Sequence, residues 1–165
     1  IPRRMIQDPV GVRYWPLEHG RDAVRTPMQW TSGENAGFTS GTPWLPVHPS
    51  HSRINVEAER TNPDSLLNLH RDLIHLRNNS PAIQHGDWVP VCDGSKGVIA
   101  YIRELGDVWH LVALNFRKRR VTMPLPENRR KDVSIRVDLS THRRRGDPAR
   151  NDAITLAPFE ATVFS

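Results

Sequence analysis

Residues 62–78 read NPDSLLNLHRDLIHLRN, and their large apolar side chains recur every three to four positions. That spacing is typical of an α-helix with one apolar face. Asn62 is a suitable N-cap, Pro63 suits the first helical position, and Asn79-Ser80-Pro81 predicts the end of the helix. Each buried leucine contributes ~1.5–3 kcal/mol, so this stripe needs a partner surface. The chain offers little to cover it except its own β-rich segment, and we expect a helix from the outside of a larger layered fold.

After Gly86 the apolar period changes to two. Residues 133–139 alternate between apolar and polar side chains, which indicates a strand with one buried face. Several short strands at near-regular spacing predict an antiparallel sandwich or small barrel. In this arrangement we expect Trp88 and Trp109 in the core and Cys92 as a buried structural thiol. The predicted strands cover residues 88–92, 98–103, 109–116, 121–125, 133–139, 154–156 and 161–164.

Residues 1–60 are interrupted throughout by proline and glycine. Proline fixes φ and restricts the residue before it, so long helices and central strands are excluded here. The segment is also rich in aromatic residues, which tend to be buried rather than disordered. We therefore predict a long, ordered loop that packs over another part of the protein. This loop and the helix form the first predicted region, residues 1–85, and residues 86–165 form the second.

The composition excludes several classes of protein. The chain has 165 residues, fewer than the roughly 200 that a complete (β/α)₈ barrel needs. A single cysteine excludes an internal disulfide, and no apolar run approaches the roughly 20 residues that cross a bilayer. The net charge is +5, and the excess lies in three clusters between predicted strands, which we interpret as solvated turns rather than a nucleic-acid groove. The clusters are residues 117–120, 129–131 and 143–145.

The remaining sequence signals predict neither a cofactor nor a metal ion. The eight histidines are scattered, His70 and His75 are five residues apart, and no glycine-rich phosphate loop is present. The chain opens at Ile1 without an initiator methionine or a signal segment. We expect a soluble, cytoplasmic piece of a longer protein, with no nucleic-acid or membrane partner.

Residues 20–30, GRDAVRTPMQW, differ from the rest of the loop. Arg21 and Arg25 are four residues apart and flank Asp22, just before a rigid Thr-Pro turn and Trp30. Guanidinium groups give directional donors to hydroxyls or carboxylates, and an indole gives an apolar plate for the face of a sugar. The same residues equally fit an Arg–Asp pair that stabilises a loop, and their chemistry leaves both interpretations open.

Further motifs surround this segment. They are DPVG at residues 8–11, NAGF at 35–38, PWLPV at 43–47, INVE at 54–57 and LAPFEA at 156–161. Together with the highly specific RTPMQW run at residues 25–30, they resemble the α-glucosidase and oligo-1,6-glucosidase branch of the α-amylase superfamily, glycoside hydrolase family 13. The resemblance covers essentially the whole chain.

The resemblance implies a mainly β chain with one long helix: the last loop and helix of a (β/α)₈ barrel, followed by an antiparallel β-sandwich domain. It places the two carboxylates of a retaining glycosidase before this segment, so no residue here is catalytic. Arg21 is similar to the family's arginine at the −1 subsite and Arg25 to its arginine at the +1 subsite, with Asp22 orienting both guanidinium groups. We expect the C-terminal part of an α-glucosidase for small α-glucosides, packed on a missing N-terminal barrel and inactive alone.

Two alternatives remain. A trehalose synthase or a sucrose isomerase carries similar loop motifs, and specificity loops outside this sequence would decide between these enzymes. A non-catalytic β-sandwich module that binds carbohydrate or a protein partner would need exposed aromatic side chains on one sandwich face.

Overall fold

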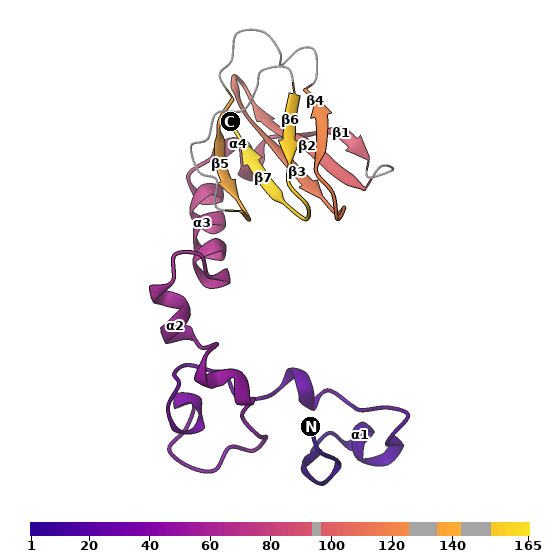
Figure 1. Cartoon of the computed structure of the whole chain (residues 1–165), viewed down its shortest axis with the longest axis vertical. Helices are drawn as coiled ribbons and strands as arrows, with labels where there is room; N and C mark the ends of the chain where they lie inside the picture. Colours follow the sequence, from indigo (N-terminus) through magenta and orange to yellow (C-terminus); the bar gives the residue numbers. More distant parts are fainter. Residues whose placement is uncertain (94–96, 126–134, 143–152) are drawn as a thin grey trace. The chain divides into compact units, whose positions relative to one another are not determined.

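The computed structural model contains two compact units, Ile1–Asn68 and Leu69–Ser165 (Figure 1). The predicted boundary between residues 85 and 86 concerns the domains of a complete protein and stays a prediction. The structure describes residues 1–93, 97–125, 135–142 and 153–165.

The first unit is built from short helical turns, as its proline spacing predicts. No helix that lies wholly within it is longer than six residues. Its elements are η1 (Arg3–Met5), α1 (Pro9–Tyr14), η2 (Asp22–Val24), η3 (Glu34–Gly37), η4 (Pro49–Ser52) and α2 (Val56–Thr61).

The predicted helix over residues 62–78 begins four residues late, as α3 (Leu66–Asn78). The side-chain oxygen of Asn62 accepts the backbone N–H two residues on, at 2.9 Å, and this Asx turn keeps the following residues out of the helix. Ser65 Oγ accepts the N–H of Asn68 at 3.2 Å and satisfies the first turn in place of Asn62. The prediction of Asn62 as the N-cap is therefore wrong, because its side chain closes the preceding turn.

The apolar stripe of α3 is largely uncovered in the described structure. Leu69 is buried, but Leu66 is 69% exposed and Ile74 58% exposed. The stripe therefore finds little cover among the described residues, as its sequence predicts.

The second unit contains two antiparallel sheets after α4 (Pro81–His85). The larger sheet has the order β1-β2-β3-β7-β5, and β4 pairs with β6 in the smaller one. The strands are β1 (Asp87–Asp93), β2 (Val98–Leu105), β3 (Val108–Asn115), β4 (Val121–Pro124), β5 (Val137–Ser140), β6 (Ala153–Leu156) and β7 (Ala161–Phe164).

Alternate side chains of both sheets bury one common core, which confirms the period of two. Cys92 and Trp109 are partly buried and pack against that core. The fully buried members are Val98, Ala100, Ile102, Leu111, Ala113, Met123, Leu125, Ile135, Val137, Ile154, Leu156 and Phe164.

Trp88 is 57% exposed, so the prediction that it lies in the core is wrong. It stands opposite Arg103 on the edge strand β1, whereas the adjacent residue of β2, Ile102, faces the core. Alternation along the strand therefore turns Trp88 to the outer face. Its ring lies 6.0 Å from that of Tyr101, centroid to centroid.

The predicted basic clusters and the predicted strand over residues 133–139 lie only partly within the described residues. Residues 118–120 of the first basic cluster are exposed in the turn between β3 and β4, as predicted. Residues 133–134 of the predicted fifth strand lie outside the described residues, as do the basic clusters at 129–131 and 143–145.

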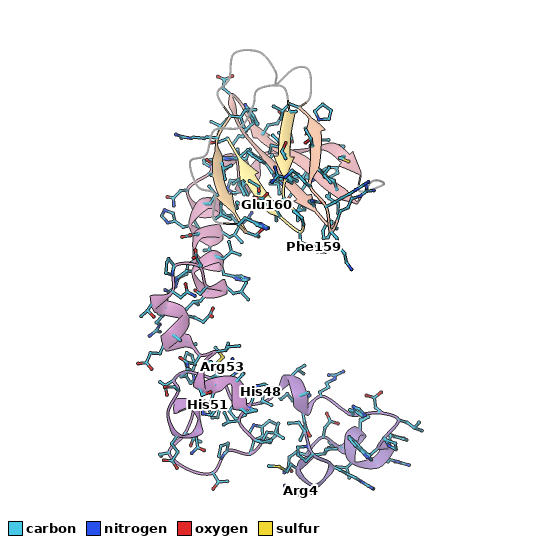
Figure 2. All side chains as sticks on the ribbon, in the orientation of Figure 1. Arg4, His48, His51, Arg53, Phe159 and Glu160 are labelled. Carbon is cyan, nitrogen blue, oxygen red and sulfur yellow. The ribbon has the colours of Figure 1, made fainter. Side chains whose placement is uncertain are left out.

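A buried carboxylate closes the turn between β6 and β7. Glu160, labelled in Figure 2, accepts hydrogen bonds from Ser140 Oγ at 2.5 Å and from the N–H of Ala157 at 2.8 Å. Phe159 adopts a φ of +54°, in the left-handed region that non-glycine residues rarely occupy. The two hydrogen bonds to Glu160 help to hold this turn.

A buried polar chain connects α4 to the large sheet. Ser80 Oγ lies 2.8 Å from Nε2 of His110, and Nδ1 of His110 lies 3.1 Å from Oδ2 of Asp138. A carboxylate only accepts hydrogen bonds, so Nδ1 of His110 donates to Asp138, and when the imidazole is neutral Nε2 accepts from the serine hydroxyl. Ser80 Oγ also accepts the N–H of Ile83 at 3.3 Å and caps α4.

We predict that Ser80→Ala lowers the free energy of unfolding by about 1–3 kcal/mol, because it removes a helix cap and leaves the buried His110 nitrogen without its donor. Urea denaturation followed by circular dichroism measures the change. Ser32→Ala, at an exposed position, is the control and should leave stability unchanged. Equal stability of the two variants would contradict a structural role for the hydrogen bonds that Ser80 makes.

Candidate functional site

Asp22 holds two distant parts of the N-terminal loop together. Its side chain is buried, and Oδ2 accepts the backbone N–H groups of Gln7 at 2.6 Å and Asp8 at 3.0 Å. Oδ1 has no hydrogen-bond partner in the described chain. This one carboxylate oxygen therefore fixes the backbone of residues 7–8 against η2.

Asp8 connects further parts of the same loop. Its Oδ1 accepts the N–H of Val10 at 2.9 Å and caps α1, while Oδ2 accepts the N–H of Arg21 at 3.0 Å. Oδ2 also lies 3.5 Å from Nη1 of Arg25. Gly20 has a φ of +68°, and an added Cβ would lie 2.8 Å from Asp8 Cβ, so only glycine permits this approach.

The prediction that Asp22 orients both guanidinium groups is wrong. Asp22 binds backbone N–H groups, and the carboxylate that contacts the Arg25 guanidinium is that of Asp8. The reason is local: η2 begins at Asp22 and carries its side chain inward, away from solvent. Sequence reasoning missed Asp8, although an Asp before a proline is an N-cap signal that could have identified it.

Arg21 and Arg25 both line one hollow of about 500 Å³. Both arginines are exposed, so their guanidinium groups can donate hydrogen bonds to hydroxyl or carboxylate oxygens of a ligand. The hollow also has two carboxylates in its lining, Asp8 and Glu18. Both oxygens of Asp8 already accept hydrogen bonds within the loop, and Glu18 is exposed. The arrangement is suited to holding a polar ligand rather than to breaking a bond.

The same hydrogen bonds determine the ionisation of Asp8. The N–H groups of Arg21 and then Val10 hold the pKa of the Asp8 carboxyl below its ordinary value of 3.8, and the charge of Arg25 adds to this effect. Desolvation acts in the opposite direction and is outweighed. Asp8 is therefore ionised whenever the loop is folded at neutral pH.

A catalytic triad consists of a hydroxyl, an imidazole and a carboxylate in hydrogen-bonding order, and the same order occurs in Ser80, His110 and Asp138. Ser80 is buried and caps α4. A substrate therefore has no access to this hydroxyl, and the hydrogen-bonded series of Ser80, His110 and Asp138 is structural. No three metal-ligating side chains gather within the described ranges.

The family described as "Alpha amylase, catalytic domain" matches residues 2–86. The chain belongs to this family, and its resemblance to glycoside hydrolase family 13 is confirmed. The described residues form a sheet-rich structure without a closed barrel.

Curated relatives carry the names of glycosidases. The chain is 37% identical over 146 residues to an oligo-1,6-glucosidase of Bacillus cereus, covering 88% of this chain and 25% of the relative. It is 31% identical over 144 residues to a trehalose-6-phosphate hydrolase of Bacillus subtilis, covering 87% of this chain and 25% of the relative. The chain thus spans about a quarter of the length of these relatives.

Solved structures of similar fold carry different names. An isomaltulose synthase from Klebsiella sp. LX3 has a TM-score of 0.76 and 36% identity, over 88% of this chain and 25% of that one. A trehalulose synthase from Pseudomonas mesoacidophila MX-45 has a TM-score of 0.79 and 25% identity, over 98% of this chain and 32% of that one.

Within the part of the chain that the structure describes, no helix is both long and apolar enough to span a bilayer.

The lowered pKa of Asp8 predicts how the loop responds to acid. Because the folded-state pKa lies below the unfolded one, ionised Asp8 stabilises the fold fully above the ordinary value of 3.8. This contribution is lost as the pH falls through the folded-state pKa. Urea denaturation between pH 7 and pH 2 should therefore show a smaller loss of stability in acid for Asp8→Asn than for the unmodified chain.

Glu18→Gln is the matched control, since Glu18 is an exposed carboxylate on the same hollow. It should keep the acid dependence of the unmodified chain. Identical acid dependence of Asp8→Asn and the unmodified chain would show that Asp8 does not hold the loop.

Proposed function

We propose that the chain acts as the C-terminal part of a retaining α-glucosidase for small α-glucosides. Residues 1–85 would be the last loop and helix of its (β/α)₈ barrel, and residues 86–165 its C-terminal β-sandwich domain. The observation that carries the proposal is a pair of exposed arginines on one hollow, backed by Asp8, in a chain of the alpha amylase family. The names of the oligo-1,6-glucosidase relatives support the substrate class.

In this proposal Arg21 holds the glucose at the −1 subsite, and Arg25 stands at the +1 subsite. Both guanidinium groups offer donors to sugar hydroxyls, and their role is to position the substrate. Asp22 serves the site indirectly, since it fixes the backbone of residues 7–8 from which Asp8 reaches both arginines.

The bond-cleaving groups belong to another part of the complete protein. A retaining glycosidase needs two carboxyl groups about 5–5.5 Å apart, one of them a free nucleophile. Asp8 cannot be that nucleophile, because both of its oxygens accept hydrogen bonds and one pairs with Arg25. Glu18 alone does not make a pair on this hollow, and in this proposal the isolated chain is inactive.

Exposed apolar side chains support packing on a catalytic barrel. The aromatic residues of the loop were predicted to be buried, but Trp30 and Phe38 are each 45% exposed. The α3 stripe is likewise uncovered at Leu66 and Ile74. A barrel surface that covers these side chains would supply the burial that the described chain lacks.

A sucrose isomerase is the second candidate, supported by the names of the isomaltulose and trehalulose synthases among the similar structures. Product analysis separates the two. An α-glucosidase given sucrose releases glucose and fructose, whereas an isomerase returns isomaltulose or trehalulose.

The exposed Trp88, whose ring lies beside that of the half-buried Tyr101, supports the third alternative, a carbohydrate-binding module, to a smaller extent. It supplies an exposed aromatic surface on the large sheet. Loss of glucan binding in Trp88→Ala, measured by calorimetric titration of the chain, would favour this alternative.

We predict that the 165-residue chain alone releases no p-nitrophenol from p-nitrophenyl α-glucoside above a heat-treated control.

In the longer protein, Arg21→Ala should lower kcat/KM by about tenfold to hundredfold, because charged hydrogen bonds contribute about 1.5–3 kcal/mol. Arg3→Ala, an exposed arginine outside the hollow, should leave kcat/KM unchanged. Turnover by the isolated chain, or equal kinetics for the two variants, would contradict the proposal.

A further inference from the structure

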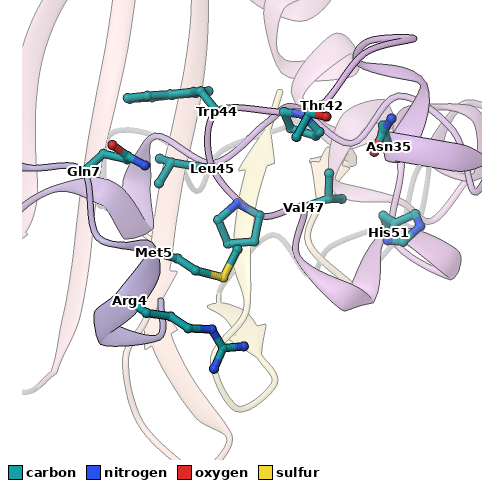
Figure 3. A pocket seen from close by; sticks show the side chains of 11 residues that line it. Arg4, Met5, Gln7, Asn35, Thr42, Trp44, Leu45, Val47 and His51 are labelled. Atoms are coloured by element: carbon teal, nitrogen blue, oxygen red, sulfur yellow. The ribbon is translucent and has the colours of Figure 1, made fainter.

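A second hollow lies in the same unit and shares no residue with the arginine site. It has a volume of about 450 Å³ and combines an aromatic plate with several polar groups. Figure 3 shows Trp44 and Gln7 toward one end of it and Asn35 and His51 toward the other. Trp44 is 55% exposed.

The polar groups of this hollow have unused hydrogen-bonding capacity. Nδ1 of His51, which Figure 2 labels, donates to the carbonyl oxygen of His48 at 3.0 Å. In a neutral ring this leaves Nε2 as an acceptor. The side-chain amide of Gln7 and the hydroxyl of Thr42 make no hydrogen bond within the described chain. The lining thus offers both donors and acceptors next to an exposed indole.

The loop backbone around this hollow is held in a defined shape. Asn35 Nδ2 donates to the carbonyl oxygens of Thr39 at 3.3 Å and Gly41 at 3.0 Å, which fixes the segment before Trp44. Gln7 is fixed from the other side by its N–H bond to Asp22. The backbone that carries the plate and its polar partners is therefore held in place before any ligand arrives.

We propose that this hollow is an accessory sugar-binding site for a short oligosaccharide, in which one glucosyl ring stacks on Trp44 beside Gln7 and a neighbouring unit bonds to Thr42 and His51. A pyranose has one apolar face and a rim of hydroxyls that both donate and accept. This combination matches an indole plate beside mixed donors and acceptors. The site does not depend on the proposed glucosidase activity, because none of its residues lines the arginine hollow.

The other chemistry that this lining could serve is a small anion, since Arg4 also lines the hollow. One arginine beside a histidine acceptor and an apolar plate matches a neutral ring better than a compact anion, which needs several convergent donors. Inorganic phosphate is therefore a useful competitor in the test.

The test uses the ¹⁵N-labelled 165-residue chain and maltotriose. The indole N–H resonance of Trp44 should shift on titration, and inorganic phosphate should leave it in place. Calorimetric titration should show about tenfold weaker maltotriose binding for Trp44→Ala and nearly unchanged binding for Trp44→Phe. Phe38→Ala, an exposed aromatic residue of the same loop that lines no described hollow, should bind like the unmodified chain.

Three results would overturn the site: an unmoved Trp44 resonance at saturating maltotriose, equal affinity of Trp44→Ala and Phe38→Ala, or a shift with phosphate alone. The guanidinium Nε–H resonances of Arg21 and Arg25 report on the arginine hollow separately. Shifts confined to those two resonances would reject the Trp44 site and leave the proposed function standing. Shifts confined to Trp44 would support the accessory site while counting against the arginine subsites.

Discussion

The carboxylates of Asp8 and Asp22 are the constraint on which the N-terminal unit depends. A proline-rich loop cannot stabilise itself through long helices or sheets, because proline removes the donors that those elements need. Two buried acids replace them: Asp22 accepts two backbone N–H groups, and Asp8 accepts two more. Hydrogen bonds of this kind to charged acceptors are stronger than neutral ones.

The placement of both proposed binding surfaces follows from these bonds. Asp8 brings Arg21 and Arg25 to one hollow, while Asp22 anchors Gln7 beside Trp44 in the other. The two surfaces are therefore coupled through a short segment of backbone, residues 7–8. A change at Asp22 should reach both hollows, although Asp22 itself lines neither.

The two units are stabilised in different ways. The described residues of the second unit bury a common core between its sheets, and polar side chains buried with it, such as His110 and Glu160, have hydrogen-bond partners. The first unit exposes several aromatic side chains and relies on polar contacts. This difference fits a self-contained β unit that follows a loop shaped to cover another surface.

The strands could be predicted from the sequence because a period of two reports directly on which face is buried. The start of α3 could not, since Asn62 is suitable both as a helix cap and as the first residue of an Asx turn. In the folded chain Asn62 forms the turn and Ser65 caps the helix. Trp88 was misplaced because its apolar side chain does not reveal which face of β1 it occupies, and the pairing with β2 turns it to the outer face. The arginine pair was visible in the sequence, but its acidic partner was not the neighbouring Asp22. Asp8 lies 13 residues before Arg21, and only the folded loop brings them together.

Amide hydrogen exchange in Asp22→Ala tests the role of this carboxylate most directly. If Asp22 organises the loop, exchange at Gln7 and Asp8 rises about tenfold, and the N–H of Arg21 loses protection too, although its own acceptor Asp8 is intact. Exchange that rises only at Gln7 and Asp8, with Arg21 unchanged, would contradict the account and reduce Asp22 to a local contact.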